Sequence, residues 1–276
     1  MDFYNILQQA LLSSDILYKE ESCNRLIEYC STHKYIKSVE DFVPYVPNEP
    51  SYASFCQIVP PKKLPKRRDF KSKEGLAILL HSIAHIEYSA IDLAFDAVYR
   101  FANMPIEYKI DWLIVAQDEI RHYSMLCDIL NSLGYRHGDF VVHKGLFDAM
   151  INTSNDILHR MAIIPRHYEA TGLDVNPRIV QKLKPYSDIK EVQRTIEALD
   201  IIYTEEIEHV KKGDRWFKWV CNQRELDYES IFIDIIKQYR LNKNRDINVK
   251  ARQKAGFSCS ELKKLGAKEC KEEDDI

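Results

Sequence analysis

Asp118-Glu119-Ile120-Arg121-His122 and Glu205-Glu206-Ile207-Glu208-His209 are the two stretches of this 276-residue sequence that decide the fold. Each contains Glu-x-x-His, and a spacing of three residues on a helix places both side chains on one face, about 60° apart. One metal ion could therefore bind both groups without a bend in the backbone. With 21 Glu and 9 His in the chain, random placement gives roughly 0.7 such pairs, so two matches need support from their surroundings.

Both pairs lie in the apolar stripe of a predicted helix. The first shares its face with Trp112, Val115, Ala116, Leu126 and Leu130, and the second with Leu199, Ile202, Tyr203, Val210, Trp216 and Phe217. An unpaired carboxylate in such a stripe is costly, so each Glu needs a positively charged partner. That partner is a metal ion or, in the simpler alternative, its own His or a nearby Arg.

Two further predicted helices each place a single glutamate in an apolar stripe. Glu87 lies among Leu80, Ile83, Ala90, Ile91 and Ala94, and Glu169 follows Leu158, Met161, Ala162 and Pro165. One Glu from each of two helices and Glu-x-x-His from each of two others is the ligand pattern of di-metal carboxylate proteins with a ferritin-like bundle. The sequence therefore predicts a site for two metal ions inside a four-helix bundle.

The predicted fold class is all-α, a ferritin-like four-helix bundle with additional N- and C-terminal helices. Only 8 of the residues are glycine, which disfavours barrels and sandwiches because they need frequent turns. The four long helices are expected over residues 74–101, residues 106–133, a segment that begins after Gly145 and ends at Gly172, and residues 188–221. One or two short helices are expected in residues 1–35 and a further helix in residues 222–245.

We predict three regions along the chain. Residues 1–68 form N-terminal helices and a proline-rich arm, residues 69–222 form the bundle, and residues 223–276 form a C-terminal helix and tail that pack on the bundle. Six of the ten prolines lie between residues 44 and 65, which predicts an extended arm over residues 41–68. The arm ends in the basic run Lys62, Lys63, Lys66, Arg67 and Arg68, which is either a solvated segment or a phosphate-contacting patch.

The donor set indicates which metals the site would take. Four carboxylates and two neutral imidazoles nearly neutralise two divalent ions, and oxygen and imidazole ligands suit Fe or Mn. We expect two iron ions, with Mn or a mixed Fe/Mn pair as alternatives, and the ligand types do not exclude zinc. The seven cysteines are odd in number and contain no C-x-x-C pair. We therefore expect reduced thiols rather than a disulfide scaffold or a zinc ribbon.

Several stretches of the chain resemble known families. Residues 118–122 resemble the D-E-x-R-H segment of bacterial di-iron monooxygenases, within the ferritin-like superfamily. The chain more closely resembles a ferritin-like family of unknown function. The stretches that carry this resemblance are Ile58-Val59-Pro60-Pro61, Leu80-His81-Ser82-Ile83-Ala84-His85-Ile86-Glu87, Glu169-Ala170-Thr171-Gly172-Leu173-Asp174, residues 205–209 and Trp216-Phe217-Lys218-Trp219-Val220-Cys221. This resemblance covers about residues 55–260, supports the fold and the metal site, and names no reaction.

The resemblance implies six metal ligands, namely Glu87, Glu119, His122, Glu169, Glu206 and His209. Asp118 and Glu205 each precede a ligand Glu and could accept the free N–H of a ligand histidine, which would fix its tautomer. The second motif carries Glu205 where the monooxygenases have Asp, and Glu208 where they have Arg, so equivalent chemistry does not follow. Tyr203, three residues before a ligand Glu, is the candidate redox or proton-donating residue.

His81 and His85 are spaced four apart and could bind a metal ion together. They lie roughly 120° and 160° around the helix from Glu87, outside the face that carries the predicted ligand. We interpret them as hydrogen-bonded packing or surface histidines, with a role near the metal site as the alternative.

Asp156 and His159 form another acid-x-x-His pair. They lie about 20 and 15 Å along the helix axis from Glu169, so we interpret them as surface polar residues. Pro165 comes one turn before Glu169 and deprives the Met161 carbonyl of its helical donor. This predicts either a local opening of the helix or a simple kink.

Our preferred functional interpretation is a di-metal oxidoreductase of the oxidase or monooxygenase type. It would activate O2 or peroxide to oxidise a small-molecule substrate, with an unidentified reductant. A tRNA-hydroxylating family also has ferritin-like architecture, so RNA is one candidate substrate. The alternatives are a ferroxidase or iron-handling protein, and a helical bundle that acts through partners without catalysis. The sequence leaves the oligomeric state open, with a dimer as one option.

Charge and hydropathy say little about the function of the protein but bear on its expected location. Lys and Arg total 39 against 42 Asp and Glu, and a formal charge of −3 neither predicts nor excludes a nucleic-acid partner. No apolar run reaches the ~18 residues of a membrane span, and no charged-then-apolar leader opens the sequence. We expect a soluble, cytoplasmic protein with no membrane partner.

Overall fold

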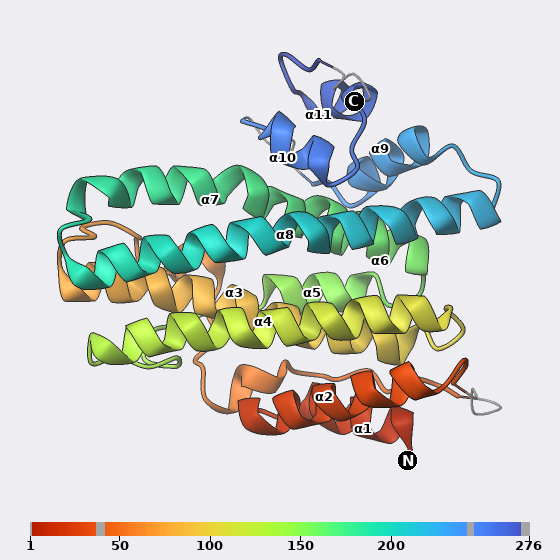
Figure 1. Ribbon diagram of the computed structural model, residues 1–276, viewed down its shortest axis with the longest axis horizontal. Coiled ribbons are helices and arrows are strands. Elements are labelled where there is room, and N and C mark those ends of the chain that lie inside the picture. The colour runs from red at the N-terminus through yellow and green to blue at the C-terminus, as the bar shows by residue number, and fades with distance from the viewer. Residues whose placement is uncertain (1, 37–41, 242–245, 272–276) are drawn as a thin grey trace. The chain divides into compact units, whose positions relative to one another are not determined.

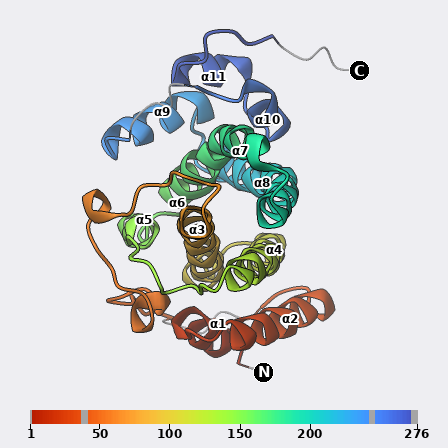
Figure 2. The same ribbon diagram turned by 90° about the vertical axis from the view of Figure 1, so that its left-hand side faces the viewer.

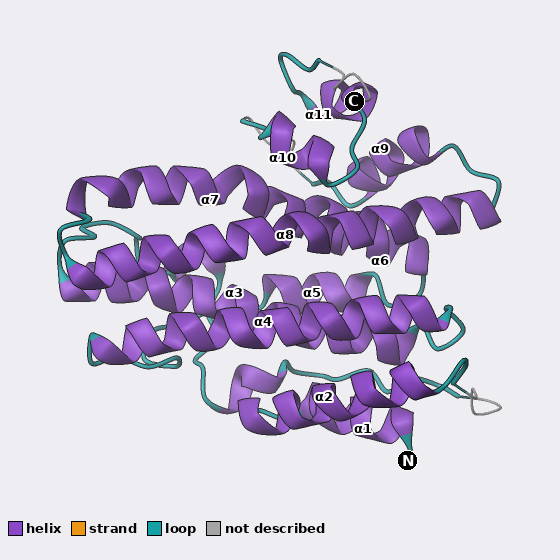
Figure 3. Cartoon of the chain, in the orientation of Figure 1, coloured by secondary structure: helices purple, strands orange, loops and turns teal. Residues whose placement is uncertain are grey.

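A computed structural model describes residues 2–36, 42–241 and 246–271. These residues form helices joined by loops and contain no strand (Figure 3), which confirms the predicted all-α class. By contacts the chain separates into two compact units, Met1–Asn152 with Leu183–Ala198 and Thr153–Lys182 with Leu199–Ile276. The three-region division expected from the sequence stays a prediction.

The first unit is built around α3 (Lys73–Arg100) and α4 (Ile106–Ser132), which confirm the first two long helices predicted. The two helices lie side by side in both views (Figure 1 and Figure 2). Among the described helices α3 alone is long and apolar enough to span a membrane, and 78% of that window is buried inside the protein, as in a core helix. Gly134 follows α4 with a φ of +88°, a left-handed conformation that glycine adopts easily.

The N-terminal helices pack on these two helices. α1 (Phe3–Leu12) contacts α3, and α2 (Ile16–Thr32) contacts α4, so two short helices form where one or two were predicted. Residues 42–68 are extended apart from the short 3-10 helices η1 (Ser51–Ser54) and η2 (Pro61–Lys63), as the prolines predict. The first residue of the predicted arm lies outside the described residues.

A buried ion pair joins α2 and the arm to α3. The Lys19 ammonium lies 2.6 Å from Asp92 Oδ1 and donates to the Ala10 carbonyl at 2.7 Å. The Ser51 hydroxyl donates to the other Asp92 oxygen at 2.6 Å. Burial lowers the pKa of Lys19 and raises that of Asp92, and the attraction between the two groups opposes both shifts. The pair therefore holds the N-terminal helices on α3 only while both charges are present.

The third predicted helix is four consecutive elements rather than one. They are α5 (Gly145–Asn152), α6 (Ile157–Ile163), the π-helix η3 (Ile164–Glu169) and α7 (Ala170–Leu183). The π-helix contains Pro165, whose missing N–H breaks the regular ladder, so the predicted local opening is confirmed.

The predicted end of this region at Gly172 is wrong, because α7 continues through Gly172 and Pro177 to Leu183. Pro177 has no N–H to donate to the Leu173 carbonyl four residues earlier. Asn248 supplies that donor, since its side-chain amide lies 3.1 Å from the Leu173 oxygen. A side chain 75 residues away thus satisfies the carbonyl that proline leaves without a helical partner.

The fourth long helix is confirmed as α8 (Lys190–Gln223). The helix predicted over residues 222–245 is shorter, because α9 runs from Tyr228 to Gln238, and residues 242–245 lie outside the described part of the chain. The predicted tail is helical at first, with α10 (Val249–Lys254) and α11 (Cys259–Leu265), and α11 packs on α9. The acidic residues 272–275 also lie outside the described residues.

The expectation of reduced thiols is wrong for one pair of cysteines. Cys259 and Cys270 form a disulfide with their Cα atoms 5.5 Å apart. They are 11 positions apart in the sequence, so no short cysteine motif marks the pair; the turn after α11 brings them together. The other five cysteines, Cys23, Cys30, Cys56, Cys127 and Cys221, are free.

We expect Asp92→Ala to lower the free energy of unfolding by about 3–5 kcal/mol, because it leaves the buried Lys19 ammonium without its counter-charge. The double variant Lys19→Met/Asp92→Leu should lose less, since it buries no unpaired charge. Urea denaturation followed by circular dichroism measures both. The control is Asp148→Ala, which breaks an exposed pair with Lys144 and should change stability by less than about 1 kcal/mol. An Asp92→Ala protein as stable as this control would contradict the account.

Candidate metal centre

Glu87 from α3 meets Glu119 and His122 from α4 inside the first unit. His122 Nδ1 lies 3.2 Å from Glu87 Oε2 and 3.6 Å from Glu119 Oε2. The three residues are 6%, 1% and 0% exposed, respectively. Each offers a ligand atom within 4.8 Å of those of the other two. This buried acid and histidine group could bind a metal ion.

The electrostatics of the group follow from two carboxylates that share one imidazole. Burial alone lowers the pKa of His122, but the hydrogen bonds and charges of Glu119 and Glu87 outweigh it and raise the pKa to about 11. The imidazole therefore carries a proton between the two carboxylates when no metal is bound. A histidine must be neutral to bind a metal ion, so metal uptake here would release that proton.

The second Glu-x-x-His motif lies on α8. His209 Nδ1 is 3.4 Å from Glu206 Oε1, which confirms that the spacing of three places both groups on one face. His209 is fully buried, and the Glu206 side chain is 14% exposed. Glu169, the remaining predicted ligand, is the half-buried last residue of the π-helix. The grouping of all six residues around two metal ions stays a prediction.

The predicted supporting residues have the following surroundings. Asp118 is half-buried and accepts a hydrogen bond from Arg121 at 3.0 Å, and Glu205 is half-buried. The Tyr203 hydroxyl accepts a hydrogen bond from the Asn248 amide at 2.9 Å. The same amide donates to the Leu173 carbonyl, so the phenol belongs to a hydrogen-bonded network. The supporting roles of Asp118 and Glu205 and the catalytic role of Tyr203 stay predictions.

His81 and His85 are hydrogen-bonded packing residues, as the first of the two alternatives predicts. Both are buried, and His85 Nε2 donates to the His143 carbonyl at 2.7 Å. His81 Nε2 accepts from the backbone N–H of Gly138 at 3.0 Å. Burial lowers the pKa of each imidazole to about 4, so both rings are neutral at pH 7.

Asp156 and His159 are partly exposed polar residues, as predicted, and they also have structural partners. Asp156 caps α6 by accepting from the Leu158 N–H at 2.8 Å, and it pairs with Arg224 at 2.9 Å. His159 Nδ1 lies 3.0 Å from the Tyr239 hydroxyl. These contacts attach α6 to the end of α8 and to the residue that follows α9.

Arg166 is the residue in the second unit that the sequence analysis missed. It lies in the π-helix three residues before Glu169 and is fully buried. Its ion pairs with Asp214 and Glu261 join segments up to 95 residues apart. The signal in the sequence is a single arginine directly after the apolar run Met161–Pro165, where a charged group must have buried partners.

Comparison with known proteins identifies a family without a stated function. The model of the family described as "Protein of unknown function (DUF455)" matches residues 12–263. An "Uncharacterized protein" of Haemophilus influenzae is 36% identical over 271 residues, which cover 94% of this chain and 92% of that protein. No solved structure matches.

We expect the His122 ring to be charged in the metal-free protein at pH 8. Its folded pKa of about 11 lies above the unfolded value near ~6.5, so its stabilisation is complete below about pH 6.5 and is lost as the pH rises through 11. Imidazole 15N NMR shifts at pH 8 report the protonation state directly. His85, with its pKa lowered to about 4, should be neutral even at pH 5.5 in the same sample. A neutral His122 at pH 8 would contradict the arrangement.

Proposed function

The chain belongs to the DUF455 family, whose description names no reaction, and from its own residues we propose that it is a ferritin-like, two-metal oxidoreductase. The observation that carries the proposal is the buried group of Glu87, Glu119 and His122 on two neighbouring long helices. Carboxylate oxygens and imidazole nitrogens are ligand types that divalent metal ions bind, and an ion held here would offset the cost of burying two carboxylates.

We propose that all six predicted ligands bind the same pair of metal ions. Glu206 would join Glu87, Glu119 and His122, and Glu169 and His209 would complete the set. The six groups then carry four negative charges against the four positive charges of two divalent ions. This is the donor set of di-metal carboxylate bundles, in which carboxylates bridge the two metals.

The donor types favour iron as the resident metal. Carboxylate oxygens and imidazole nitrogens suit iron and manganese, and the proposed set contains no thiolate that would favour copper(I) or an iron–sulfur cluster. We propose two iron ions, with manganese or a mixed pair as the alternative. When bound, such ions would supply the redox electrons and Lewis acidity with which O2 or peroxide is activated to oxidise a substrate.

The residues of the chain would control access and protons at that site. Glu119 and His122 are at most 1% exposed, so bulk water is kept from their ligand atoms. Asp118 and Glu205 would accept the second ring N–H of the ligand histidines and keep the metal-binding nitrogens unprotonated. We propose that the Tyr203 hydroxyl, which Asn248 orients, gives or takes the proton that accompanies oxidation.

One observation on the arm favours RNA as the substrate class. All five basic residues of the run in the arm, Lys62, Lys63, Lys66, Arg67 and Arg68, are exposed. Exposed lysine and arginine side chains attract phosphates by releasing counterions, independently of base sequence. A small molecule remains the other substrate class.

We expect the purified protein to bind about two Fe(II) per chain in an anaerobic titration, and the bound iron to be oxidised when O2 is admitted. Glu119→Ala should lose at least one equivalent, because it removes a buried oxygen ligand. The control is Asp128→Ala, an exposed acid on the same helix, which should bind as the wild type does. A wild-type protein that takes up no Fe(II) or Mn(II) would contradict the proposal.

Iron oxidation in the same preparation distinguishes an oxidoreductase from an iron-handling protein. Iron oxidation that stops after one turnover per site and awaits a reductant supports an oxidoreductase. Continued deposition of many ferric ions per chain would contradict it in favour of a ferroxidase.

If RNA is the substrate, replacing the five basic residues of the arm by Gln should weaken RNA binding and flatten its salt dependence. Each phosphate contact contributes about −0.7 to the slope of log K against log salt for single strands. Fluorescence anisotropy with labelled RNA measures this slope between about 50 and 200 mM salt, the range over which phosphate contacts weaken strongly. Lys250→Gln/Lys254→Gln, on α10, is the control. Equal slopes in all three proteins would contradict an RNA substrate held by the arm.

A further inference from the structure

The π-helix η3 contains Pro165 and carries Glu169 as its last residue. In a π-helix each hydrogen bond spans five residues instead of the four of an α-helix, and this geometry is rare and confined to short stretches of a chain, so contacts with neighbouring elements bear on where its side chains lie. The inference below rests on the proposed function, in which Glu169 is a metal ligand.

The first reference is a close contact between Pro165 and Gly213 of α8. A Cβ atom at Gly213 would lie 2.1 Å from Pro165 Cβ and 2.4 Å from its Cγ, so the proline ring occupies the space that any larger residue would need. Both partners are rigid at this point, because one is a ring and the other is helix backbone. The contact therefore fixes how closely the π-helix approaches α8.

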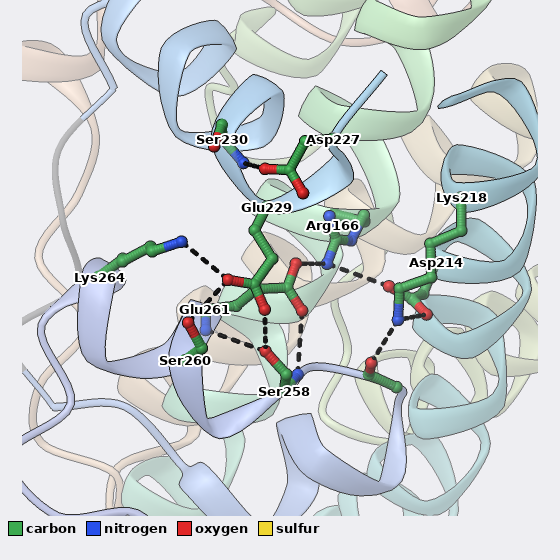
Figure 4. Close-up of polar contacts among 11 residues, drawn as sticks. Arg166, Asp214, Lys218, Asp227, Glu229, Ser230, Ser258, Ser260, Glu261 and Lys264 are labelled. Atoms are coloured by element: carbon green, nitrogen blue, oxygen red, sulfur yellow. Dashed lines mark hydrogen bonds and ion pairs between the residues drawn. The ribbon is translucent and has the colours of Figure 1, made fainter. Parts of the chain in front are cut away.

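The second reference is the ion pair one residue further along each element. Arg166 Nη2 lies 3.0 Å from Asp214 Oδ1, and Figure 4 shows the two side chains pointing toward each other. Lys218, one turn later on α8, lies 2.9 Å from the other Asp214 oxygen. Two consecutive residues of the π-helix thus contact two consecutive residues of α8, which fixes the register as well as the distance.

The third reference comes from the C-terminal helices. Glu261 of α11 pairs with the same Arg166 nitrogen and is fully buried. Its backbone position is set by a capping box, in which Ser258 and Glu261 exchange side-chain and backbone hydrogen bonds at the start of α11. Arg166 is therefore a junction of three elements, namely the π-helix, α8 and α11.

Aromatic rings hold the guanidinium in this position. The Arg166 Cζ atom lies 4.5, 4.2 and 4.5 Å from the ring centroids of Phe217, Phe232 and Phe257. Nε and Nη1 have no hydrogen-bond partner among the described residues, so the remaining edges of the guanidinium face apolar and aromatic surroundings. A fully buried cation in this environment depends on its two carboxylates, and movement of the π-helix would break both ion pairs.

We propose that Arg166 is the positioning residue for Glu169. It locks the π-helix on α8 so that Glu169 keeps a fixed place relative to Glu206 and His209, the two predicted ligands on the same helix as Asp214. Arg166 and Glu169 are three residues apart and lie within one turn of the π-helix, so a shift at Arg166 carries the carboxylate with it. Arg166 acts on the metal through this geometry and without contact to it.

The test compares Arg166→Met with Arg166→Lys, using Co(II) as the probe metal. Arg166→Met keeps most of the side-chain volume and removes the charge, and we expect Co(II) binding to weaken about 10-fold or more. The visible d–d bands of the bound Co(II) should also change, because they report ligand geometry and a purely structural role would leave them unmoved. Arg166→Lys keeps the charge and should recover part of both effects.

The matched control is Lys264→Ala, which breaks the exposed ion pair with Glu229 on the neighbouring helices α11 and α9 and should leave the Co(II) spectrum and affinity unchanged. If Arg166→Met fails to fold, Gly213→Ala replaces it, because the added methyl displaces Pro165 while every charge is kept. Hydrogen exchange of residues 164–172 in the metal-free proteins should be faster in Arg166→Met or Gly213→Ala than in the control.

Three results would overturn the inference or its premise, and they are distinguishable. Wild-type Co(II) bands and affinity in a folded Arg166→Met or Gly213→Ala protein would overturn the positioning role while leaving the proposed function intact. Unchanged hydrogen exchange of residues 164–172 would overturn the anchoring itself. A wild-type protein that binds no Co(II) would contradict the proposed function, and exchange would still decide whether Arg166 anchors the π-helix.

Discussion

The burial of carboxylates on the long helices is the constraint on which the rest of the structure depends. Glu87 and Glu119 lie almost completely out of water, and a single imidazole between them offsets part of the cost of removing two negative charges from solvent. The arrangement requires α3 and α4 to stay in register along their length. The Lys19 and Asp92 pair and the N-terminal helices pack along these two helices and support that register.

The spacing of residues along the helices is what made most of the candidate site predictable. Glu-x-x-His at Glu119 and Glu206 determines which face each pair occupies before any fold is known, and both pairs lie within ion-pair distance in the structure. Three of the four long helices, α3, α4 and α8, were predictable for the same reason, since the apolar stripe that holds each acid also defines the helix. The predicted end of the second long helix at residue 133 is within one residue of the end of α4, and Gly134 after it has the left-handed backbone that glycine adopts easily.

What the sequence could not supply are contacts made by residues far apart in the chain. The end of the third helix was misplaced at Gly172 because the carbonyl opposite Pro177 is satisfied by Asn248, 75 residues from Leu173. The Cys259 and Cys270 disulfide depends on the turn after α11, which no short motif encodes. Arg166 was missed because its partners, Asp214 and Glu261, come from two other helices. In each case a contact with a residue far away in the sequence overrides local propensity. The residues next to the position in the sequence do not identify that contact partner.

The central claim is that the acids and the imidazole of α3 and α4 bind a metal ion. The most direct measurement is X-ray diffraction from crystals grown with Fe(II) or Mn(II), with data collected on both sides of the absorption edge of the metal. The account predicts an anomalous peak in contact with Glu87, Glu119 and His122, with the imidazole nitrogen directed at the metal. Full occupancy of another site, with His122 still protonated between the two carboxylates and no peak beside it, would contradict the account.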